Sequence, residues 1–133
     1  THRGIFEQSA KTARELLDAP RDVGVLHGDI HHANVLDFGP KGWLAIDPKG
    51  LYGERGFDFA NIFCNPDSQS ALAPGCFARR IEIVRQAGDI DHRRLLQWVL
   101  AWTGLSAAWI LEDDLDPTTP LEVAKLATLA LGL

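Results

Sequence analysis

With 133 residues, the chain has room for one domain or for part of a larger one. Its hydrophobic fraction of 46% and charged fraction of 23% are typical of globular proteins and exclude intrinsic disorder. The net charge of −5 argues against a nucleic-acid partner, because binding to a phosphate backbone requires a basic face. No run of about 18 apolar residues is present, so no membrane span or membrane partner is expected.

The ends and the cysteines bear on the origin of the chain. It contains no Met and begins with Thr1-His2-Arg3, so we expect an excised or truncated segment. Cys64 and Cys76 are too few for a disulfide framework, and no signal peptide precedes them. We therefore expect a cytoplasmic protein with reduced thiols.

The first predicted elements lead into a polar loop. Apolar residues at helical spacing predict a helix over residues 5–19, which Pro20 ends. A short β-branched run over residues 23–26 predicts a buried strand, and residues 27–33 are polar and loop-like.

A hairpin and a short helix are expected next. Strands over residues 35–38 and 43–46 flank the turn cluster Gly39-Pro40-Lys41-Gly42. We expect a glycine-rich loop over residues 51–56 and a helix over residues 57–64, which Asn65-Pro66-Asp67 ends.

The remaining sequence is predicted to be helical. The expected helices cover residues 77–87, 91–111, with Asp91 as the N-cap, and 117–131, with Gly132 after the last one. The tryptophans at 43, 98, 102 and 109 are expected in the core. The fold class is therefore α+β and mainly helical, with a small β-hairpin that carries the loops of chemical interest.

The segment His27-Gly28-Asp29-Ile30-His31-His32-Ala33-Asn34 is the most informative in the sequence, and Asp47 follows at the end of an apolar strand. Phosphoryl transfer needs a carboxylate that accepts a hydrogen bond from the attacking hydroxyl, together with oxygen ligands for Mg²⁺. Asp and Asn oxygens are suitable ligands for Mg²⁺. A loop with Asp and Asn five residues apart, followed by a hairpin that ends in Asp, can bring three such groups together.

This pattern matches the kinase catalytic loop H-x-D-x-x-x-x-N followed by a metal-binding Asp. The Gly between His and Asp, the pair His31-His32 and the run Trp43-Leu44-Ala45-Ile46-Asp47-Pro48-Lys49-Gly50 resemble the aminoglycoside/hydroxyurea antibiotic resistance kinases, which include streptomycin kinases. The segment Gly53-Glu54-Arg55-Gly56-Phe57-Asp58 is similar to the next segment of that family. The motifs cover roughly residues 23 to 65.

The resemblance implies a phosphotransferase that moves the γ-phosphate of ATP to a hydroxyl of a small molecule, such as an aminoglycoside or a hydroxyurea-like compound. Asp29 would be the catalytic base, and Asn34 and Asp47 would bind Mg²⁺ and thereby the ATP. His31 is implied as a phosphate or substrate contact. His27 would pack under the loop, and Asp58 would accept hydrogen bonds from the loop backbone.

The resemblance also implies that residues 1–133 form a single kinase-like C-terminal lobe. A glycine-rich phosphate loop and the strand Lys with its helix Glu do not occur in the sequence, so we expect these residues alone to be inactive. The face that would contact an N-terminal lobe is expected to be apolar and to allow self-association.

Two other functions remain open at this point. Gly28-Asp29-Ile30-His31 also resembles part of a metallophosphoesterase motif, in which Asp and His bind two metals, although His92 is the one His downstream of the loop. Alternatively, the chain is a truncated kinase lobe with a binding role only. Asp47 and His31 also have the simpler reading of polar turn and loop residues.

Overall fold

The fold is described here from a computed structural model that covers residues 2–133. Helices dominate it, and the strands form two separate two-stranded antiparallel sheets. In chain order the elements are α1 (Arg3–Asp18), β1 (Val23–Leu26), η1 (His32–Asn34), β2 (Val35–Asp37), η2 (Gly39–Lys41), β3 (Trp43–Ala45), β4 (Leu51–Glu54), α2 (Gly56–Ala60), η3 (Asn61–Cys64), α3 (Ser68–Ala71), α4 (Cys76–Ala87), α5 (His92–Glu112) and α6 (Thr118–Leu131). The expected mainly helical α+β class is confirmed.

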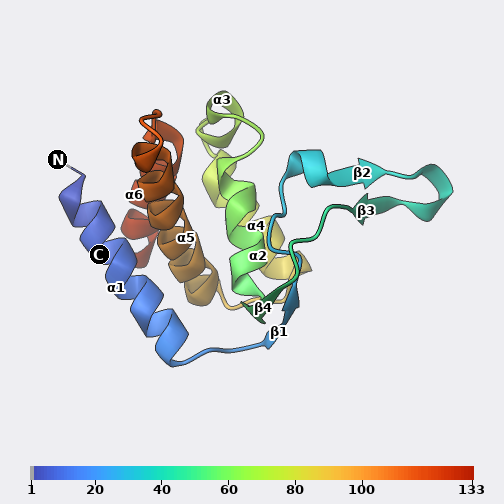
Figure 1. Cartoon of the computed structure of the whole chain (residues 1–133), viewed down its shortest axis with the longest axis horizontal. Helices are drawn as coiled ribbons and strands as arrows, with labels where there is room; N and C mark the ends of the chain where they lie inside the picture. The colour runs from blue at the N-terminus through green and yellow to red at the C-terminus, as the bar shows by residue number, and fades with distance from the viewer. Residues whose placement is uncertain (1) are drawn as a thin grey trace.

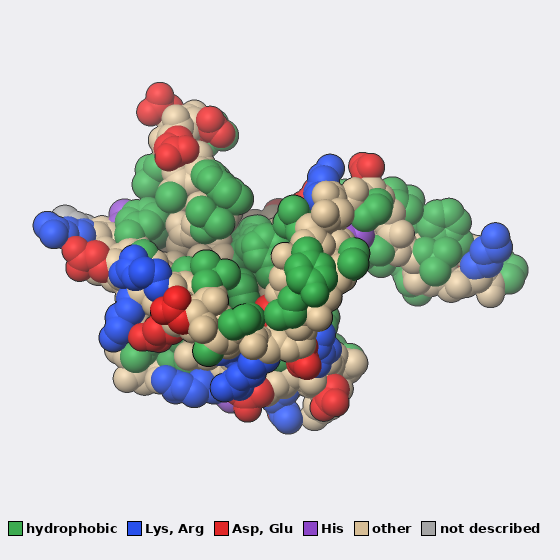
Figure 2. Space-filling model, turned by 60° about the horizontal axis from the view of Figure 1, so that its bottom comes forward, with side chains coloured by type: hydrophobic (Ala, Val, Ile, Leu, Met, Phe, Trp, Pro, Cys, Tyr) green, Lys and Arg blue, Asp and Glu red, His purple; other side chains and the backbone are tan. Residues whose placement is uncertain are grey.

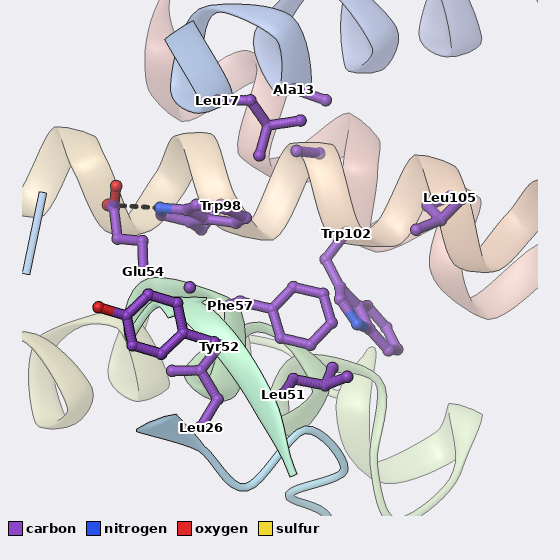
Figure 3. A pocket seen from close by; sticks show the side chains of 12 residues that line it. Ala13, Leu17, Leu26, Leu51, Tyr52, Glu54, Phe57, Trp98, Trp102 and Leu105 are labelled. Atoms are coloured by element: carbon purple, nitrogen blue, oxygen red, sulfur yellow. Dashed lines mark hydrogen bonds between the residues drawn. The ribbon is translucent and has the colours of Figure 1, made fainter. Parts of the chain in front are cut away.

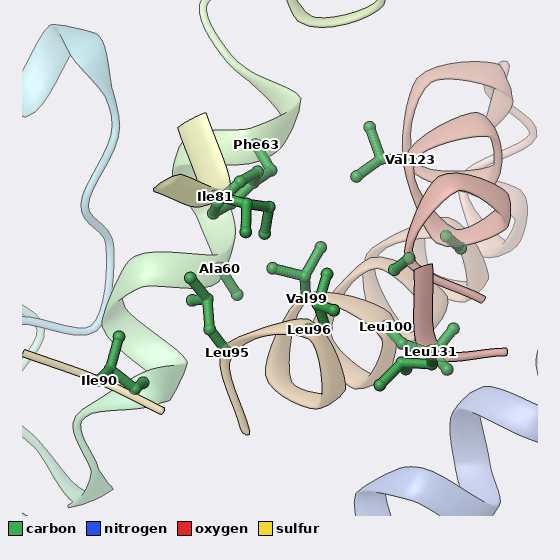
Figure 4. Close-up of a cluster of buried hydrophobic side chains, with 12 residues drawn as sticks. Ala60, Phe63, Ile81, Ile90, Leu95, Leu96, Val99, Leu100, Val123 and Leu131 are labelled. Carbon is green, nitrogen blue, oxygen red and sulfur yellow. The ribbon is translucent and has the colours of Figure 1, made fainter. Parts of the chain in front are cut away.

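The long helix α5 is the centre of the molecule, with α1 and α6 packed against it (Figure 1). Side chains from α5, α6, α4 and the α2–η3 segment meet in one buried cluster (Figure 4). Its fully buried members include Phe63, Leu95 and Leu100. Each such side chain contributes about 1.5–3 kcal/mol by leaving water, so this cluster stabilises the helical frame that carries the loops.

The helix boundaries follow the local signals. The Asp91 side chain accepts a hydrogen bond from the backbone N–H of Arg94, 2.9 Å away, and so caps α5 as predicted. At the other end of the chain, Gly132 adopts a φ of 75° directly after α6, a left-handed conformation that glycine tolerates and that ends helices. None of the helices within residues 2–133 is both long enough and apolar enough to cross a membrane.

The two sheets differ in how far the sequence predicts them. The β2–β3 hairpin is confirmed, with Leu36 paired to Leu44 across its centre. The expected glycine-rich loop over residues 51–56 is wrong, because residues 51–54 form β4 and pair with β1 in the register Val23 to Glu54. This pairing places Leu51, the first residue of β4, beside Leu26, the last residue of β1. The polar loop that starts at His27 follows directly.

The expectation that β1 is buried is also wrong. The side chain of Val25 is 85% exposed, and so is most of its cross-strand partner Tyr52, because one face of this two-stranded sheet is open to solvent. The β2–β3 hairpin projects from the helices and carries exposed hydrophobic side chains along its length (Figures 1 and 2). The large hydrophobic side chains exposed on the four strands are Val23, Val25, Leu36, Phe38 (directly after β2), Trp43, Leu44, Leu51 and Tyr52.

The tryptophans divide between the core and the surface. Trp98 is buried and Trp102 partly buried, as expected, but Trp43 is 71% and Trp109 53% exposed. Trp43 lies on the projecting hairpin and Trp109 near the C-terminal end of α5.

A buried ion pair joins β4 to α5. The Glu54 carboxylate accepts hydrogen bonds from Arg94 Nη2 at 2.6 Å and Nε at 2.7 Å, and from Trp98 Nε1 at 2.6 Å. The backbone N–H of Arg21 donates a fourth bond at 2.8 Å, and Arg94 also donates to the carbonyl of Ala19. These contacts attach the chain between α1 and β1 to the helical frame.

Trp98 also borders an apolar pocket of about 370 Å³ between α1, α5 and β4, whose lining includes Leu17, Tyr52, Phe57 and Trp102 (Figure 3). None of the sequence-predicted site residues lines this pocket.

Candidate active site

The site is built on the segment His27–Asn34, which joins β1 to β2. Gly28 adopts a φ of 92°, and a Cβ at this position would lie 3.1 Å from the side chains of Leu51 and Lys49. Both the backbone conformation and the close contact therefore favour glycine between His27 and Asp29. This explains why the loop carries His-Gly-Asp in that order.

The Asp58 carboxylate holds the start of this loop. Its Oδ2 accepts a hydrogen bond from the backbone N–H of His27 and its Oδ1 one from Gly28, each at 2.8 Å. Asp58 lies in the first turn of α2, next to β4, so the loop is tied to a helix that packs on α5. These are the backbone contacts that the resemblance implied for Asp58.

His27 connects the loop to the end of β3. Its Nδ1 accepts a bond from the N–H of Asp29 at 3.1 Å, so its proton lies on Nε2, which donates to the carbonyl of Ile46 at 2.6 Å. The N–H of Lys49 in turn donates to the His27 carbonyl at 2.6 Å. Residues 46–49 are therefore held against the loop at two points, and Asp47 lies between them.

Asp29 is partly exposed, with 33% of its side chain accessible, and is surrounded by nitrogen donors. Its Oδ2 lies 3.4 Å from Asn34 Nδ2 and 3.6 Å from His31 Nε2. The N–H of Ala33 donates to His31 Nδ1 at 3.2 Å, and His31 Nε2 lies 3.2 Å from Asn34 Nδ2 as well as facing Asp29. The separations from Asp29 Oδ2 are long, which leaves the carboxylate free to accept a bond from a substrate hydroxyl.

Asn34 and Asp47 have the donor chemistry that Mg²⁺ requires. Asn34 Nδ2 donates to the carbonyl of Asp29 at 2.9 Å, which orients the amide and turns its Oδ1 away from Asp29. The carbonyl of Asn34 accepts from the N–H of Ile46 at 2.8 Å, so Asp47 follows directly after a residue bonded to Asn34. Asp47 is exposed and adopts a φ of 60°, a strained conformation of the kind that occurs at functional sites. Hard oxygen donors of this kind fit Mg²⁺, which keeps several waters or phosphate oxygens among its ligands.

His32 stands apart from this group. Although it is largely exposed, loss of solvation and then the positive charge of Arg80 lower its pKa below the ordinary value. Within residues 2–133, no three His, Cys, Asp or Glu side chains are arranged to hold a metal ion together. Cys64 and Cys76 are both free thiols, and burial raises the pKa of Cys64 to about 12.

The sequence interpretation missed two residues at the site, Asn61 and Asn65. Asn61 Nδ2 lies 3.5 Å from Asp29 Oδ1, and Asn65 Nδ2 donates to Asn61 Oδ1 at 3.0 Å. A signal was available, because Asp58, Asn61 and Asn65 are spaced at i, i+3 and i+7. On a helix, this spacing places all three side chains on the face that Asp58 turns toward the loop.

Comparisons with known proteins agree with the motifs and extend beyond them. The sequence profile of the family described as aminoglycoside/hydroxyurea antibiotic resistance kinase matches residues 1–114. The chain is 56% identical over 110 residues to a streptomycin 3''-kinase of Klebsiella pneumoniae, covering 79% of this chain and 41% of the relative. It is 32% identical over 129 residues to a streptomycin 6-kinase of Streptomyces griseus, covering 91% and 40%. It is 30% identical over 130 residues to a hydroxyurea phosphotransferase of Kitasatospora aureofaciens, covering 98% and 36%.

The chain thus spans about two fifths of the length of the curated relatives it matches. No solved structure matches it significantly. The family profile covers most of the chain, including the loop, the hairpin and the helices through the whole of α5, and it supports a kinase over a metallophosphoesterase. The chain belongs to the aminoglycoside/hydroxyurea antibiotic resistance kinase family.

Proposed function

We propose that this chain is the catalytic lobe of a phosphotransferase that moves the γ-phosphate of ATP to a hydroxyl of a small molecule. The observation that carries the proposal is the position of Asp29. Its backbone is fixed through His27 and Asp58, while its carboxylate stays partly exposed beside Asn34 and His31. This is the arrangement that a base acting on a substrate hydroxyl requires, since phosphoryl transfer depends on positioning and charge stabilisation.

Asp29 accepts the hydrogen bond of the attacking hydroxyl and orients its oxygen toward the phosphate. Asn34 Oδ1 and the Asp47 carboxylate would hold Mg²⁺, which when bound neutralises charge on the ATP phosphates. The His31 ring, whose Nε2 faces Asp29, is close enough to the base to contact the transferred phosphate or the acceptor. Its 27% exposure leaves room for such a contact.

The acceptor that we propose is an aminoglycoside of the streptomycin type. Two of the relatives are named streptomycin kinases, and the one with 56% identity is a 3''-kinase. Hydroxyurea is the second candidate, because another relative is a hydroxyurea phosphotransferase. A reaction that consumes ATP belongs in the cytoplasm, and neither nucleic acid nor membrane is part of the proposed reaction.

The exposed apolar side chains of the strands are the part of the surface that we expect an N-terminal lobe to cover. Without such a lobe, we expect the 133 residues to bind ATP weakly, to be inactive and to self-associate through this face.

The test is phosphate transfer by the protein encoded in the complete reading frame that contains this chain. With γ-labelled ATP and Mg²⁺, we expect label on streptomycin, and mass spectrometry then identifies the hydroxyl that carries it. Asp29→Asn should remove most of kcat while the KM for ATP stays nearly constant. Turnover close to that of the unmodified enzyme would refute the role of Asp29, and transfer to hydroxyurea alone would replace the acceptor.

A further inference from the structure

Both oxygens of the Asp29 carboxylate face nitrogen donors, and the donors come from different parts of the chain. Asn34 and His31, on the same loop, lie beside Oδ2. Asn61 approaches Oδ1 from η3, 32 residues further along, with its Nδ2 at 3.5 Å. The carboxylate is therefore contacted at Oδ2 by residues of its own loop and at Oδ1 by a residue of η3.

The orientation of the Asn61 amide is itself determined by a neighbour. Asn65 Nδ2 donates to Asn61 Oδ1 at 3.0 Å and to the Asn61 carbonyl at 2.8 Å. A carboxamide has its oxygen on one side and its NH₂ group on the other. With Oδ1 engaged by Asn65, Nδ2 can only face Asp29.

Asn65 is anchored in turn by α4. Arg80 Nη1 donates to the carbonyl of Asn65 at 2.6 Å and to that of Ile62 at 2.8 Å, which fixes the end of η3. A continuous series of hydrogen bonds thus runs from Arg80 through Asn65 and Asn61 to Asp29. All of these side chains are partly buried, so solvent competes with the bonds less than it would at the surface.

We propose that Asn61 is a positioning residue for catalysis: it holds the plane of the Asp29 carboxylate so that one oxygen lone pair points at the acceptor hydroxyl, and Asn65 keeps its amide turned the right way. This inference rests on the proposed function of Asp29 as the base. A freely rotating carboxylate would present its lone pairs in many directions, and small errors of placement cost large factors in rate. The separation of 3.5 Å leaves the carboxylate free to accept the substrate hydrogen bond, and contacts of this kind tighten in the substrate complex.

The experiment compares kcat and KM in the complete protein. Asn61→Ala should lower kcat about 10- to 100-fold while both KM values change little, since the residue acts on the transition state and does not touch substrate. Asn61→Asp keeps the shape and the acceptor for Asn65 but places a second carboxylate against Asp29, so it should lose at least as much kcat. Asn65→Ala should lower kcat less, because the Asn61 amide is still present and has only lost the contact that orients it. Gln86→Ala removes an exposed carboxamide from α4 and serves as the control with unchanged kcat.

A double-mutant cycle separates positioning from a general structural role. If Asn61 acts through the Asp29 carboxylate, Asn61→Ala should have no further effect on the residual rate of Asp29→Asn. An equal fold-loss of rate in both backgrounds, a change in KM alone, or an unchanged kcat in Asn61→Asp would each overturn the inference. If Asn61→Ala fails to fold, the kcat of Asn61→Asp still tests the inference. Normal turnover by Asp29→Asn would instead refute the proposed function, so the two failures are distinguishable.

Discussion

The buried pair of Glu54 and Arg94 yields the most quantitative prediction about this chain. The Glu54 side chain is 4% and the Arg94 side chain 9% exposed, and the two groups share two hydrogen bonds of 2.6 and 2.7 Å. In Glu54→Ala, the Arg94 guanidinium stays buried without its partner, and Trp98 and Arg21 lose an acceptor. Breaking a buried pair in this way costs about 3–5 kcal/mol. Domains of this size have roughly 5–15 kcal/mol of stability, so the loss takes a large share.

The ion pair also predicts how stability depends on pH. Burial alone would raise the pKa of Glu54, but the hydrogen bonds from Arg94, from the backbone of Arg21 and from Trp98 outweigh burial and lower the pKa below the ordinary 4.5. The folded state therefore favours the charged carboxylate. Its contribution is fully present above pH 4.5 and is lost as the pH falls below that value toward the lower pKa of the folded state.

Urea denaturation of the purified chain tests both expectations. Glu54→Ala should lower the midpoint strongly at pH 7, and the gap to the unmodified chain should narrow below about pH 4.5. The matched control is Glu122→Ala, which breaks a 2.6 Å pair with Lys125 whose side chains are each 43% exposed, and it should change little. Equal effects of the two substitutions, or pH curves that stay parallel, would refute the assignment of this stabilisation to the buried pair.

Two further predictions concern the site, and a third concerns the isolated chain. Asp58→Ala should lower the free energy of unfolding by about 1–3 kcal/mol, because the N–H groups of His27 and Gly28 lose their acceptor, and should lower kcat because the loop shifts. Thermal melts and assays of the complete protein measure the two effects. A variant with full stability and activity would contradict the importance of these contacts. Asp47→Ala should sharply raise the Mg²⁺ concentration needed for half-maximal activity, since the proposed metal site then lacks its anionic ligand. An unchanged Mg²⁺ titration would place the metal elsewhere. The isolated 133 residues should fold, bind Mg-ATP only weakly and self-associate; micromolar binding by a monomer, measured by calorimetry with light scattering, would disprove this.

The parts of the fold that the sequence predicts are those set by local interactions. The hairpin turn at Gly39–Gly42, the Asp91 cap and the stop at Gly132 each depend on residues within a few positions of one another. Strand β4 was missed because its partner β1 lies 25 or more residues earlier and its sequence includes a glycine and a glutamate. Nothing local indicates that Glu54 is buried, because its partner Arg94 comes 40 residues later from α5.

The residues of the candidate site likewise differ in whether the sequence alone identifies them. Asp29, Asn34 and Asp47 could be selected as candidates from the sequence because their residue types suit phosphoryl transfer and their spacing matches the kinase catalytic-loop motif. For Asn61 the sequence offers only the helical spacing from Asp58, which indicates a shared face but not the loop that this face contacts. The structure supplies that neighbour: the carboxylate of Asp58 and the amide of Asn61, one helical turn apart, contact successive parts of one loop. A single helical face thus orients the backbone of the segment through Asp58 and faces the Asp29 carboxylate through Asn61. The frame built by α2, η3 and α5 therefore determines the geometry at Asp29 as much as the loop does.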